Sequence, residues 1–321
     1  MSKISVVVPI YGVENYIERC VRSLFEQTLD DIEYIFVDDC TPDNSISILK
    51  KVLAEYPERI PSTRIEKMSK NSGLPAVRRY GISLAKGDYI IACDSDDYVE
   101  KEMYEVMYNM ALNGDFDLVQ CDIDVVDDNE ILYILSSDKA QLSSEELKTL
   151  ILEGDISNSL CNKLVRRSLY QNQELEFPTR NVDEDNVIAV QLAYFSTKLC
   201  YIKKPFYKAY FNSASMSRKQ GIEHIAKRFE DSYANSQIIV SFLQSRGYAD
   251  DNKAVITAKI RPKQKLLPAV ISIKGVKKWK SIYPEINWKV VFDKRFSVAI
   301  RLVFLSIMVY IYPIFKRFNY K

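Results

Sequence analysis

Four stretches suited to buried β-strands alternate with helical stretches over about the first 95 residues, and this alternation constrains the fold more than any other feature. Strands are expected at residues 4–11, 32–39 and 88–94, where apolar and often β-branched residues follow one another, and a weaker strand is expected near 63–67. The intervals between them carry helical apolar spacing or helix start signals. Such repeated strand–helix–strand units predict right-handed crossovers and a mostly parallel sheet flanked by helices, which is an α/β fold.

The pattern changes after residue 115, where strands and helices no longer alternate regularly. The sequence predicts strands at 115–126 and 130–136, helices at 143–151, 162–170 and 184–195, and two strands or a hairpin at 196–211. The helix at 184–195 is expected to be amphipathic. Ser143 and Glu146 have the spacing of a capping box at the start of the first of these helices. Beyond about residue 222 the chain is expected to be mostly helical.

The six cysteines lie far apart in the sequence, and none is part of a Cys-x-x-Cys pair. This spacing predicts neither a disulfide framework nor a zinc site. The start of the chain does not have the pattern of a secretory signal. A reducing, cytoplasmic environment is therefore expected.

Charge is distributed unevenly along the chain, although the formal net charge is only +1. Residues 251–321 hold 16 Lys and Arg against 3 Asp and Glu. A basic C-terminal part of this kind predicts contact with something anionic. Because aromatic residues are not interleaved with the basic ones between 253 and 278, no nucleic-acid partner is expected.

Polar residues follow three of the four predicted N-terminal strands at the points where those strands end. Tyr11 ends the first strand, Asp38 and Asp39 close the second, and the cluster Asp94–Asp97 follows the fourth. Because the carboxyl ends of parallel strands meet at one edge, these residues are expected to share a rim. Open α/β sheets bind their ligands at such a rim.

The aspartate cluster has several explanations, because neighbouring carboxylates repel each other unless a positive group lies between them. An EF-hand loop would need glycine where Val99 stands and a helix where a strand is predicted. An aspartyl-phosphate phosphatase usually carries its aspartates after the first strand, and a solvated turn that caps the next helix would need no ligand. The remaining explanation is a divalent cation held by Asp94 and Asp96 and completed by substrate phosphates.

Four motifs occur in order within residues 4–99. They are Pro-x-Tyr at 9–11, Val-Asp-Asp at 37–39, Asn-x-Gly-x-x-x-x-Arg at 71–78 and Asp-x-Asp at 94–96. Together they resemble the nucleotide-binding half of family 2 glycosyltransferases of the bacterial surface-polysaccharide type. The chain departs from the family at Cys40-Thr41-Pro42, where Gly-Ser or Asn-Ser is common, and at Gly12, where Asn is usual. The resemblance implies an inverting enzyme with a GT-A fold and a helical C-terminal extension.

The resemblance also implies a nucleotide-sugar donor, commonly a UDP-sugar, bound across the strand ends. Pro9 and Tyr11 would flank the base, with Glu14 close behind. Asp39 would accept a hydrogen bond from the uracil N–H. Asp38 would assist it or orient the neighbouring loop.

The counterpart of the family's arginine is Arg78, which would face the nucleotide or its phosphates. A diphosphate needs such donors, although Arg79 beside it leaves open which of the two points inward. In the Asp-x-Asp pair, Asp96 would bind the Mn²⁺ or Mg²⁺ that bridges the diphosphate, and Asp94 would contact the ribose, the sugar or the metal. Asp97 would add a supporting contact. The metal would stabilise charge on the departing diphosphate.

Inversion in one displacement requires a base that takes the proton of the acceptor hydroxyl. The family places this aspartate within a Glu-Asp pair at the start of a helix. Among Asp183, Glu184 and Asp185, the resemblance selects Glu184 and Asp185, with Asp185 as the base, because 161–170 upstream resembles the family's Asn-Lys-Leu-Tyr segment. The alternative is that acidic residues merely favour a helix N-terminus. Some relatives use a histidine near the position of His224 as a metal ligand, but a lone histidine there is more often structural.

The resemblance divides the chain into a nucleotide-sugar-binding half (1–115), an acceptor-binding half (116–221) and a helical extension (222–321). It implies sugar transfer from a UDP-sugar to a hydroxyl of a glycan or polyprenol-linked acceptor. Two alternatives are a nucleotide-sugar-binding protein without turnover and a nucleotidyltransferase. The latter would need a glycine-rich basic loop after the first strand, which the segment from residue 9 to 18 lacks.

The C-terminal tail, 290–321, is both apolar and basic. Its longest uncharged run, between Arg301 and Lys316, has 14 residues, whereas a membrane-spanning helix needs about 20. This pattern predicts a helix that lies on an anionic membrane surface, at the inner face of the cell membrane, or that packs on protein.

Overall fold

The computed structural model describes residues 2–128, 130–211 and 221–309. Within it the chain forms two compact units, the first of Met1–Asn181 and Asp185–Ser213, the second of Val182–Glu184 and Ala214–Lys321. Each unit has its own apolar core. Residues 310–321 of the predicted membrane-binding tail lie outside the described residues.

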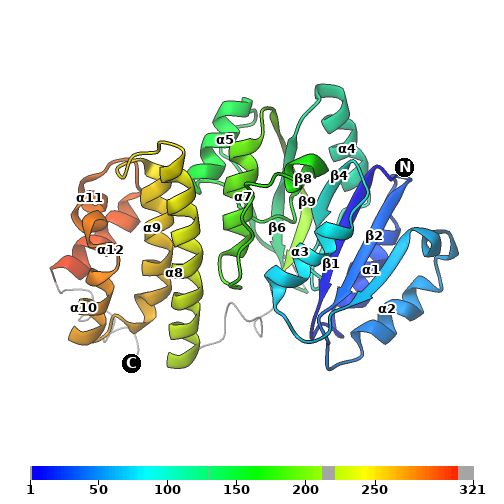
Figure 1. Cartoon of the computed structure of the whole chain (residues 1–321), viewed down its shortest axis with the longest axis horizontal. Helices are drawn as coiled ribbons and strands as arrows, with labels where there is room; N and C mark the ends of the chain where they lie inside the picture. The colour runs from blue at the N-terminus through cyan, green and yellow to red at the C-terminus, as the bar shows by residue number, and fades with distance from the viewer. Residues whose placement is uncertain (1, 129, 212–220, 310–321) are drawn as a thin grey trace. The chain divides into compact units, whose positions relative to one another are not determined.

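The first unit is built on a nine-stranded mixed sheet (Figure 1). Its strands are β1 (Ile4–Ile10), β2 (Ile32–Asp38), β3 (Thr63–Lys67), β4 (Tyr89–Ala92), β5 (Tyr98–Val99), β6 (Leu118–Val126), β7 (Ile131–Leu135), β8 (Lys163–Arg166) and β9 (Leu199–Tyr210). The order is β3-β2-β1-β4-β8-β6-β9-β5, with β7 paired to β6. Strands β1 to β4 pair in parallel, as do β6 and β9, whereas β8 is antiparallel to both of its neighbours. The predicted α/β class and its four N-terminal strands are confirmed.

Helices cover both faces of this sheet. They are α1 (Ile17–Phe25), α2 (Ser45–Leu53), α3 (Leu74–Leu84), α4 (Met103–Gly114), α5 (Ser144–Glu153), α6 (Arg167–Tyr170) and α7 (Glu184–Phe195), with a short 3₁₀ helix at Pro57–Ser62. Phe25 of α1 packs its ring edge-on against Tyr34, with 5.2 Å between centroids. On the other face, α3 approaches so closely at Gly81 that an added Cβ would lie 2.5 Å from a methyl carbon of Val7. Since Tyr34 and Val7 occupy alternate positions in the paired strands, α1 and α3 lie on opposite faces.

Two predicted elements in the second half of this unit were wrong. Residues 162–170, predicted as one helix, form the strand β8 and only the short helix α6, because 163–166 fill the space between β4 and β6 in the sheet. Residues 196–211, predicted as two strands or a hairpin, form the single strand β9. This strand stays paired with β6 across an irregularity between Cys121 and Ile123. The predicted capping box of Ser143 and Glu146 is confirmed in both directions.

The helix α7 has the predicted bounds, but it is not amphipathic. All of its residues from Asn186 to Ala193 are buried. The one long polar side chain among them, Gln191, is fully buried and exchanges hydrogen bonds of 2.8 Å with the backbone N–H and C=O of Glu176. The helix is therefore a central element of the core, with its first turn at the candidate site described below.

The second unit is helical, as predicted. It contains α8 (Ile222–Ser245), α9 (Lys253–Leu266), α10 (Ile273–Ser281), α11 (Asn287–Phe292) and α12 (Val298–Met308), with 3₁₀ turns at Leu267–Ala269 and Pro284–Ile286. Its core surrounds the fully buried Trp279, whose ring packs edge-on against Phe304 at 4.7 Å. Among the described helices, none is both long and apolar enough to cross a membrane.

Candidate active site

The carboxyl ends of β2, β1 and β4 meet at one edge of the sheet, as the sequence predicted. Ile10 of β1 pairs with Asp38 of β2, and Val7 of β1 pairs with Ala92, the last residue of β4. The residues that follow these strands therefore share a rim. Tyr11 stands at this rim with 51% of its surface exposed, so its ring is available to a flat ligand.

Pro9 and Glu14, the other residues near Tyr11 that were predicted to lie at the base, each have a role in holding the fold. Pro9 is buried within β1. Glu14 is exposed, and its carboxylate accepts hydrogen bonds of 3.1 Å from the backbone N–H and the side-chain amide of Asn44. Glu14 thus holds the residue that precedes α2.

Asp39 holds the loop from which α3 starts. Its carboxylate oxygens accept hydrogen bonds from the backbone N–H groups of Ser72 at 2.7 Å and Gly73 at 2.9 Å. Gly73 has a φ of +83°, and an added Cβ would lie 2.9 Å from the side-chain oxygen of Asn181, so this turn requires glycine. Asp39 therefore helps to position the helix that carries Arg78, and its remaining lone pairs can still accept from a ligand.

Asp38 orients the loop that follows β2. Its carboxylate accepts a hydrogen bond of 2.7 Å from the backbone N–H of Thr41. Beside it, a pocket of about 320 Å³ lies between α2 and β3, and its walls include Asp38, Thr41, Lys50, Ile65 and Lys67. Lys67 lies 3.8 Å from the other carboxylate oxygen of Asp38. The second of the two roles predicted for Asp38, orienting the loop, is the one visible in these contacts.

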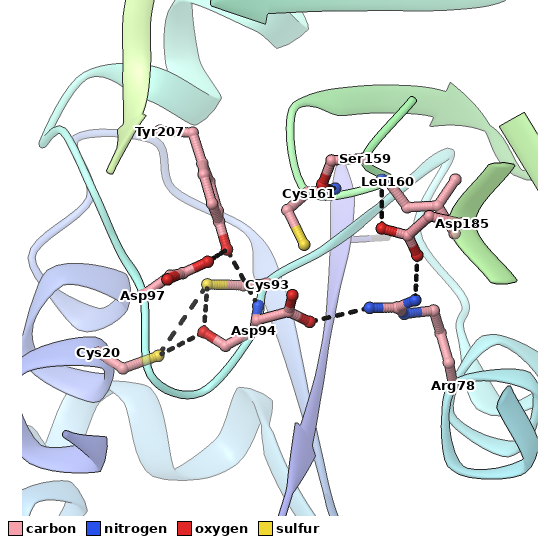
Figure 2. A network of polar contacts seen from close by, with 10 residues as sticks. All are labelled: Cys20, Arg78, Cys93, Asp94, Asp97, Ser159, Leu160, Cys161, Asp185 and Tyr207. Atoms are coloured by element: carbon pink, nitrogen blue, oxygen red, sulfur yellow. Dashed lines mark hydrogen bonds and ion pairs between the residues drawn. The ribbon is translucent and has the colours of Figure 1, made fainter. Parts of the chain in front are cut away.

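Arg78 connects two carboxylates from distant parts of the chain (Figure 2). One of its terminal nitrogens donates to Asp94 at 2.8 Å, and the other donates to Asp185. Its side chain is only 3% exposed. The adjacent Arg79 is exposed and lies over the ring of Phe177 at 5.4 Å. Of the two arginines between which the sequence did not decide, Arg78 is the one that points inward.

The acidic residues around the start of α7 are separated by the structure. Asp185, in the first turn, accepts from Arg78 and also from the backbone N–H of Leu160 at 3.3 Å. Glu184 is buried. Asp183 belongs to the second unit, where it lies 3.1 Å from the ammonium of Lys265. Of the three acids, Asp185 is the one that shares the guanidinium of Arg78 with Asp94.

Asp97 fixes the short strand β5 to β9. It is buried, and its carboxylate accepts hydrogen bonds from the Tyr207 hydroxyl at 2.6 Å and the Tyr210 backbone N–H at 2.7 Å. Burial raises the pKa of Asp97 well above its usual range, and repulsion from Asp96 and Asp94 raises it further. The surroundings of Asp97 thus disfavour its negatively charged form.

A divalent cation fits this donor set. Carboxylate oxygens are the ligands that Mg²⁺ and Mn²⁺ prefer, and a cation would relieve the repulsion that acts on Asp97. Within the described residues, no group of three or more His, Cys, Asp or Glu side chains is gathered for metal binding. A cation here would be held by one or two carboxylates and would need substrate phosphates and water to complete its ligand shell.

Two groups in the site were missed by the sequence reasoning, the backbone N–H of Leu160 and the hydroxyl of Tyr207. A backbone donor has no residue signature, and Tyr207 contacts Asp97 only because β9 pairs with β5, where Tyr207 lies opposite Val99. The single histidine, His224, is exposed in the first turn of α8.

Comparison with known proteins identifies the family. Residues 5–173 match the model of glycosyl transferase family 2. The Bacillus subtilis glycosyltransferase EpsH is 31% identical over 255 residues, which cover 77% of this chain and 71% of EpsH. The poly(ribitol-phosphate) beta-glucosyltransferase of Bacillus spizizenii is 26% identical over 263 residues, or 80% of this chain and 39% of that protein.

Solved structures show the same fold. Staphylococcus aureus TarS 1–349 in complex with UDP-GlcNAc superposes with a TM-score of 0.61 at 16% identity, covering 97% of this chain and 88% of TarS 1–349. The mannosyltransferase PcManGT of Pyrobaculum calidifontis, in complex with GDP-Man and Mn²⁺, superposes with a TM-score of 0.51 at 14% identity, covering 96% and 86%. The protein is therefore a glycosyltransferase of family 2, with a GT-A fold followed by a helical C-terminal region.

Proposed function

We propose that this enzyme transfers a sugar from a UDP-sugar to a hydroxyl of a glycan or polyprenol-linked acceptor, with inversion and with help from Mn²⁺ or Mg²⁺. The observation that carries the proposal is the placement of buried Arg78 between Asp94 and Asp185. Further support comes from the fold shared with TarS, which was solved with UDP-GlcNAc. We assign donor binding to residues 1–115, acceptor binding to 116–221, and a supporting role to the helical extension 222–321.

The donor nucleotide lies along the rim of the sheet. The exposed ring of Tyr11 stacks on the uracil, with Pro9 beneath the rim and Glu14 behind. Asp39 accepts the uracil N–H on a lone pair that its two backbone bonds leave available. Asp38 keeps the adjoining loop in place.

The diphosphate end of the donor meets the aspartate cluster. Asp96, with Asp94 beside it, would hold a divalent cation, which would supply stabilisation of negative charge on the leaving diphosphate. Asp94 also contacts the ribose or the sugar. Arg78 orients Asp94 through its hydrogen bond of 2.8 Å, and its positive charge favours the diphosphate of the donor.

In the acceptor half, Asp185 acts as the base. The acceptor oxygen attacks the sugar C1 as its proton passes to the Asp185 carboxylate. The bond from C1 to the diphosphate oxygen breaks, and its electron pair leaves with UDP. One displacement inverts the configuration at C1, and Glu184 supports the start of α7 from a buried position.

The second unit offers a surface suited to an anionic membrane. Exposed apolar side chains gather on α11 and α12, which pack together, and we name this set the apolar ridge: Trp288, Phe292, Val298, Leu302, Leu305 and Val309. Lys289, Lys294 and Arg295 are exposed on or next to α11. An apolar stripe with adjacent basic residues suits peripheral binding at the inner face of the cell membrane, where a polyprenol-linked acceptor would lie.

The proposed reaction can be tested with a panel of UDP-sugars, Mn²⁺ and hydroxyl acceptors, by following UDP release and the anomeric configuration of the product. An α-linked donor should give a β-linked product. A retained configuration would contradict the single displacement, and turnover with GDP- or dTDP-sugars alone would contradict the choice of nucleotide.

A further inference from the structure

Lys163 is a charged side chain in the core that the proposed mechanism does not use. It lies on β8 and is fully buried. Its ammonium donates to the backbone oxygens of Ser157 at 2.6 Å and Ser159 at 2.8 Å, and to the side-chain oxygen of Asn162 at 3.1 Å. A lysine ammonium has three N–H donors, so this cradle matches the protonated form of Lys163 completely.

The loop that Lys163 gathers, residues 157–161, borders the proposed base (Figure 2). Its Leu160 N–H donates to one carboxylate oxygen of Asp185 at 3.3 Å, while Arg78 donates to the other oxygen. A second bond joins the loop to α7, from the side-chain amide of Asn158 to that of Asn186. The loop therefore sets the orientation of the Asp185 carboxylate.

We propose that Lys163 is a positioning residue for sugar transfer: it holds loop 157–161 so that the Leu160 N–H orients Asp185 toward the acceptor hydroxyl. This inference rests on the proposed role of Asp185 as the base. Without the ammonium, the two serine carbonyls lose their donor inside the protein, which favours a shift of the loop. A displacement of about 1 Å at a reacting group can lower the rate about 100-fold.

The hydrogen bonds that hold loop 157–161 depend on pH, because they depend on the protonation state of Lys163. Burial lowers the pKa of Lys163 to about 7, against the opposing effects of Asp185 on α7, Cys121 on β6 and Cys161 in the loop. Below that pH all three bonds are made. Above it the neutral amine has one donor fewer, so the loop loses a bond and turnover should decline on the alkaline side.

A second buried lysine provides a matched control. Lys263, in the second unit, is also fully buried, its pKa is also lowered to about 7 by burial, and it donates to the backbone oxygen of Trp279 at 2.7 Å. Replacing either lysine with methionine removes a buried ammonium but keeps an unbranched side chain. Only the Lys163 change should affect catalysis.

The test compares the full-length Lys163→Met and Lys263→Met variants with the native chain at 25 °C, once circular dichroism has shown that all three are folded. Amide hydrogen exchange of the peptide that covers 157–161 reports the loop, and kcat, KM and their pH profiles report catalysis. Lys163→Met should exchange faster in that peptide and lose about 10- to 100-fold in kcat. Its donor KM should stay within about 3-fold, and the decline of kcat above pH 7 should disappear. Lys263→Met should match the native chain in all of these.

Either unchanged exchange in the Lys163→Met loop or an unchanged kcat and pH profile would overturn the proposal. An equal loss of kcat in both variants would also overturn it, because it would indicate a general effect of removing a buried charge. The assignment of Asp185 as the base is tested separately from the role of Lys163. If Asp185→Asn turned over normally, the base assignment would fail, whereas the exchange data would still report whether Lys163 holds the loop.

Discussion

The guanidinium of Arg78 donates to the carboxylate of Asp185, although 107 residues separate the two in the sequence. Arg78 lies on α3, which starts from the loop held by Asp39, and Asp185 lies in the first turn of α7. The same guanidinium binds Asp94 at the end of β4. The buried guanidinium of Arg78 thus contacts both Asp94, which is proposed to bind the donor, and Asp185, which is proposed to take the acceptor proton.

Replacing Asp185 with asparagine removes the proposed base but keeps a side chain of the same size. We expect kcat to fall by about 10²–10⁴-fold, the usual contribution of a positioned general base, with little change in UDP affinity. Steady-state kinetics and UDP calorimetry check this. Glu145→Gln is the matched control, because Glu145 is an exposed acid in the first turn of another helix, α5. Equal turnover of Asp185→Asn and the native chain would remove Asp185 from the mechanism.

Replacing Arg78 with methionine leaves two carboxylates facing each other without their cation. Breaking a buried ion pair by removing one partner costs about 3–5 kcal/mol, and we expect about 2–4 kcal/mol because Asp94 and Asp185 keep some solvent contact. Arg79→Met removes an exposed arginine and should change the free energy of unfolding by less than about 0.5 kcal/mol. Urea unfolding of both variants measures these changes in the free energy of unfolding. Similar midpoints for the two would show that the bridge does not stabilise the fold.

Arg78→Lys separates charge from geometry at the same position. Lysine keeps the charge but lacks the planar fork that reaches two carboxylates at once. We expect this variant to be folded, yet to lose at least about 10-fold in kcat, with the loss read from donor-saturated rates. Native turnover in Arg78→Lys would mean that charge alone is sufficient there.

The lowered pKa of Lys263 predicts a pH dependence of stability. Its pKa is about 7 in the folded protein, against 10.5 for a free lysine side chain. Between these values the unfolded chain binds more protons, so the contribution of Lys263 to the free energy of unfolding rises with pH. Relative to the native chain, Lys263→Met should therefore be more stable at pH 6 than at pH 9.

Thermal unfolding of Lys263→Met and the native chain at both pH values measures this difference. Lys277→Met, which changes an exposed lysine on α10, is the control and should show no such trend. Parallel melting curves for Lys263→Met and the native chain would contradict the lowered pKa.

Membrane binding by the apolar ridge predicts a loss of flotation when the ridge becomes polar. The double variant Phe292→Ser and Leu302→Ser changes two exposed residues of α11 and α12, 72% and 57% exposed. We expect it to float several-fold less with vesicles containing phosphatidylglycerol, and salt should weaken the binding of the native chain. The control variant Ile131→Ser and Ile134→Ser changes two similarly exposed residues of β7. Equal flotation of the two variants would rule out the ridge as the membrane contact.

The N-terminal part of the fold was predictable because its signals are local. Strands β1, β2 and β4 are buried on both faces, so each is mostly apolar apart from Ser5, Glu33 and the strand-end Asp38. The parallel arrangement then brings Tyr11, Asp38 and Asp94 to one rim whatever the details of the loops. The capping box at Ser143 is equally local, since its two partners are three residues apart.

The second half was less predictable because its elements depend on distant partners. Residues 163–166 become a strand only because β4 and β6 flank them, and their own pattern is equally compatible with a helix. That Arg78 rather than Arg79 points inward likewise follows from packing between segments far apart in the sequence. The same is true of the hydrogen bond from the Leu160 N–H to Asp185.

Asp96 is proposed to bind a divalent cation together with the donor nucleotide. The most direct measurement is calorimetric titration of UDP with and without Mn²⁺, on the native chain and on Asp96→Ala. Mn²⁺ should strengthen UDP binding by the native chain at least about 10-fold, since a metal held by one or two carboxylates is completed by phosphates. Asp96→Ala should lose that Mn²⁺ effect. The same Mn²⁺ effect in both proteins, or none in either, would contradict it.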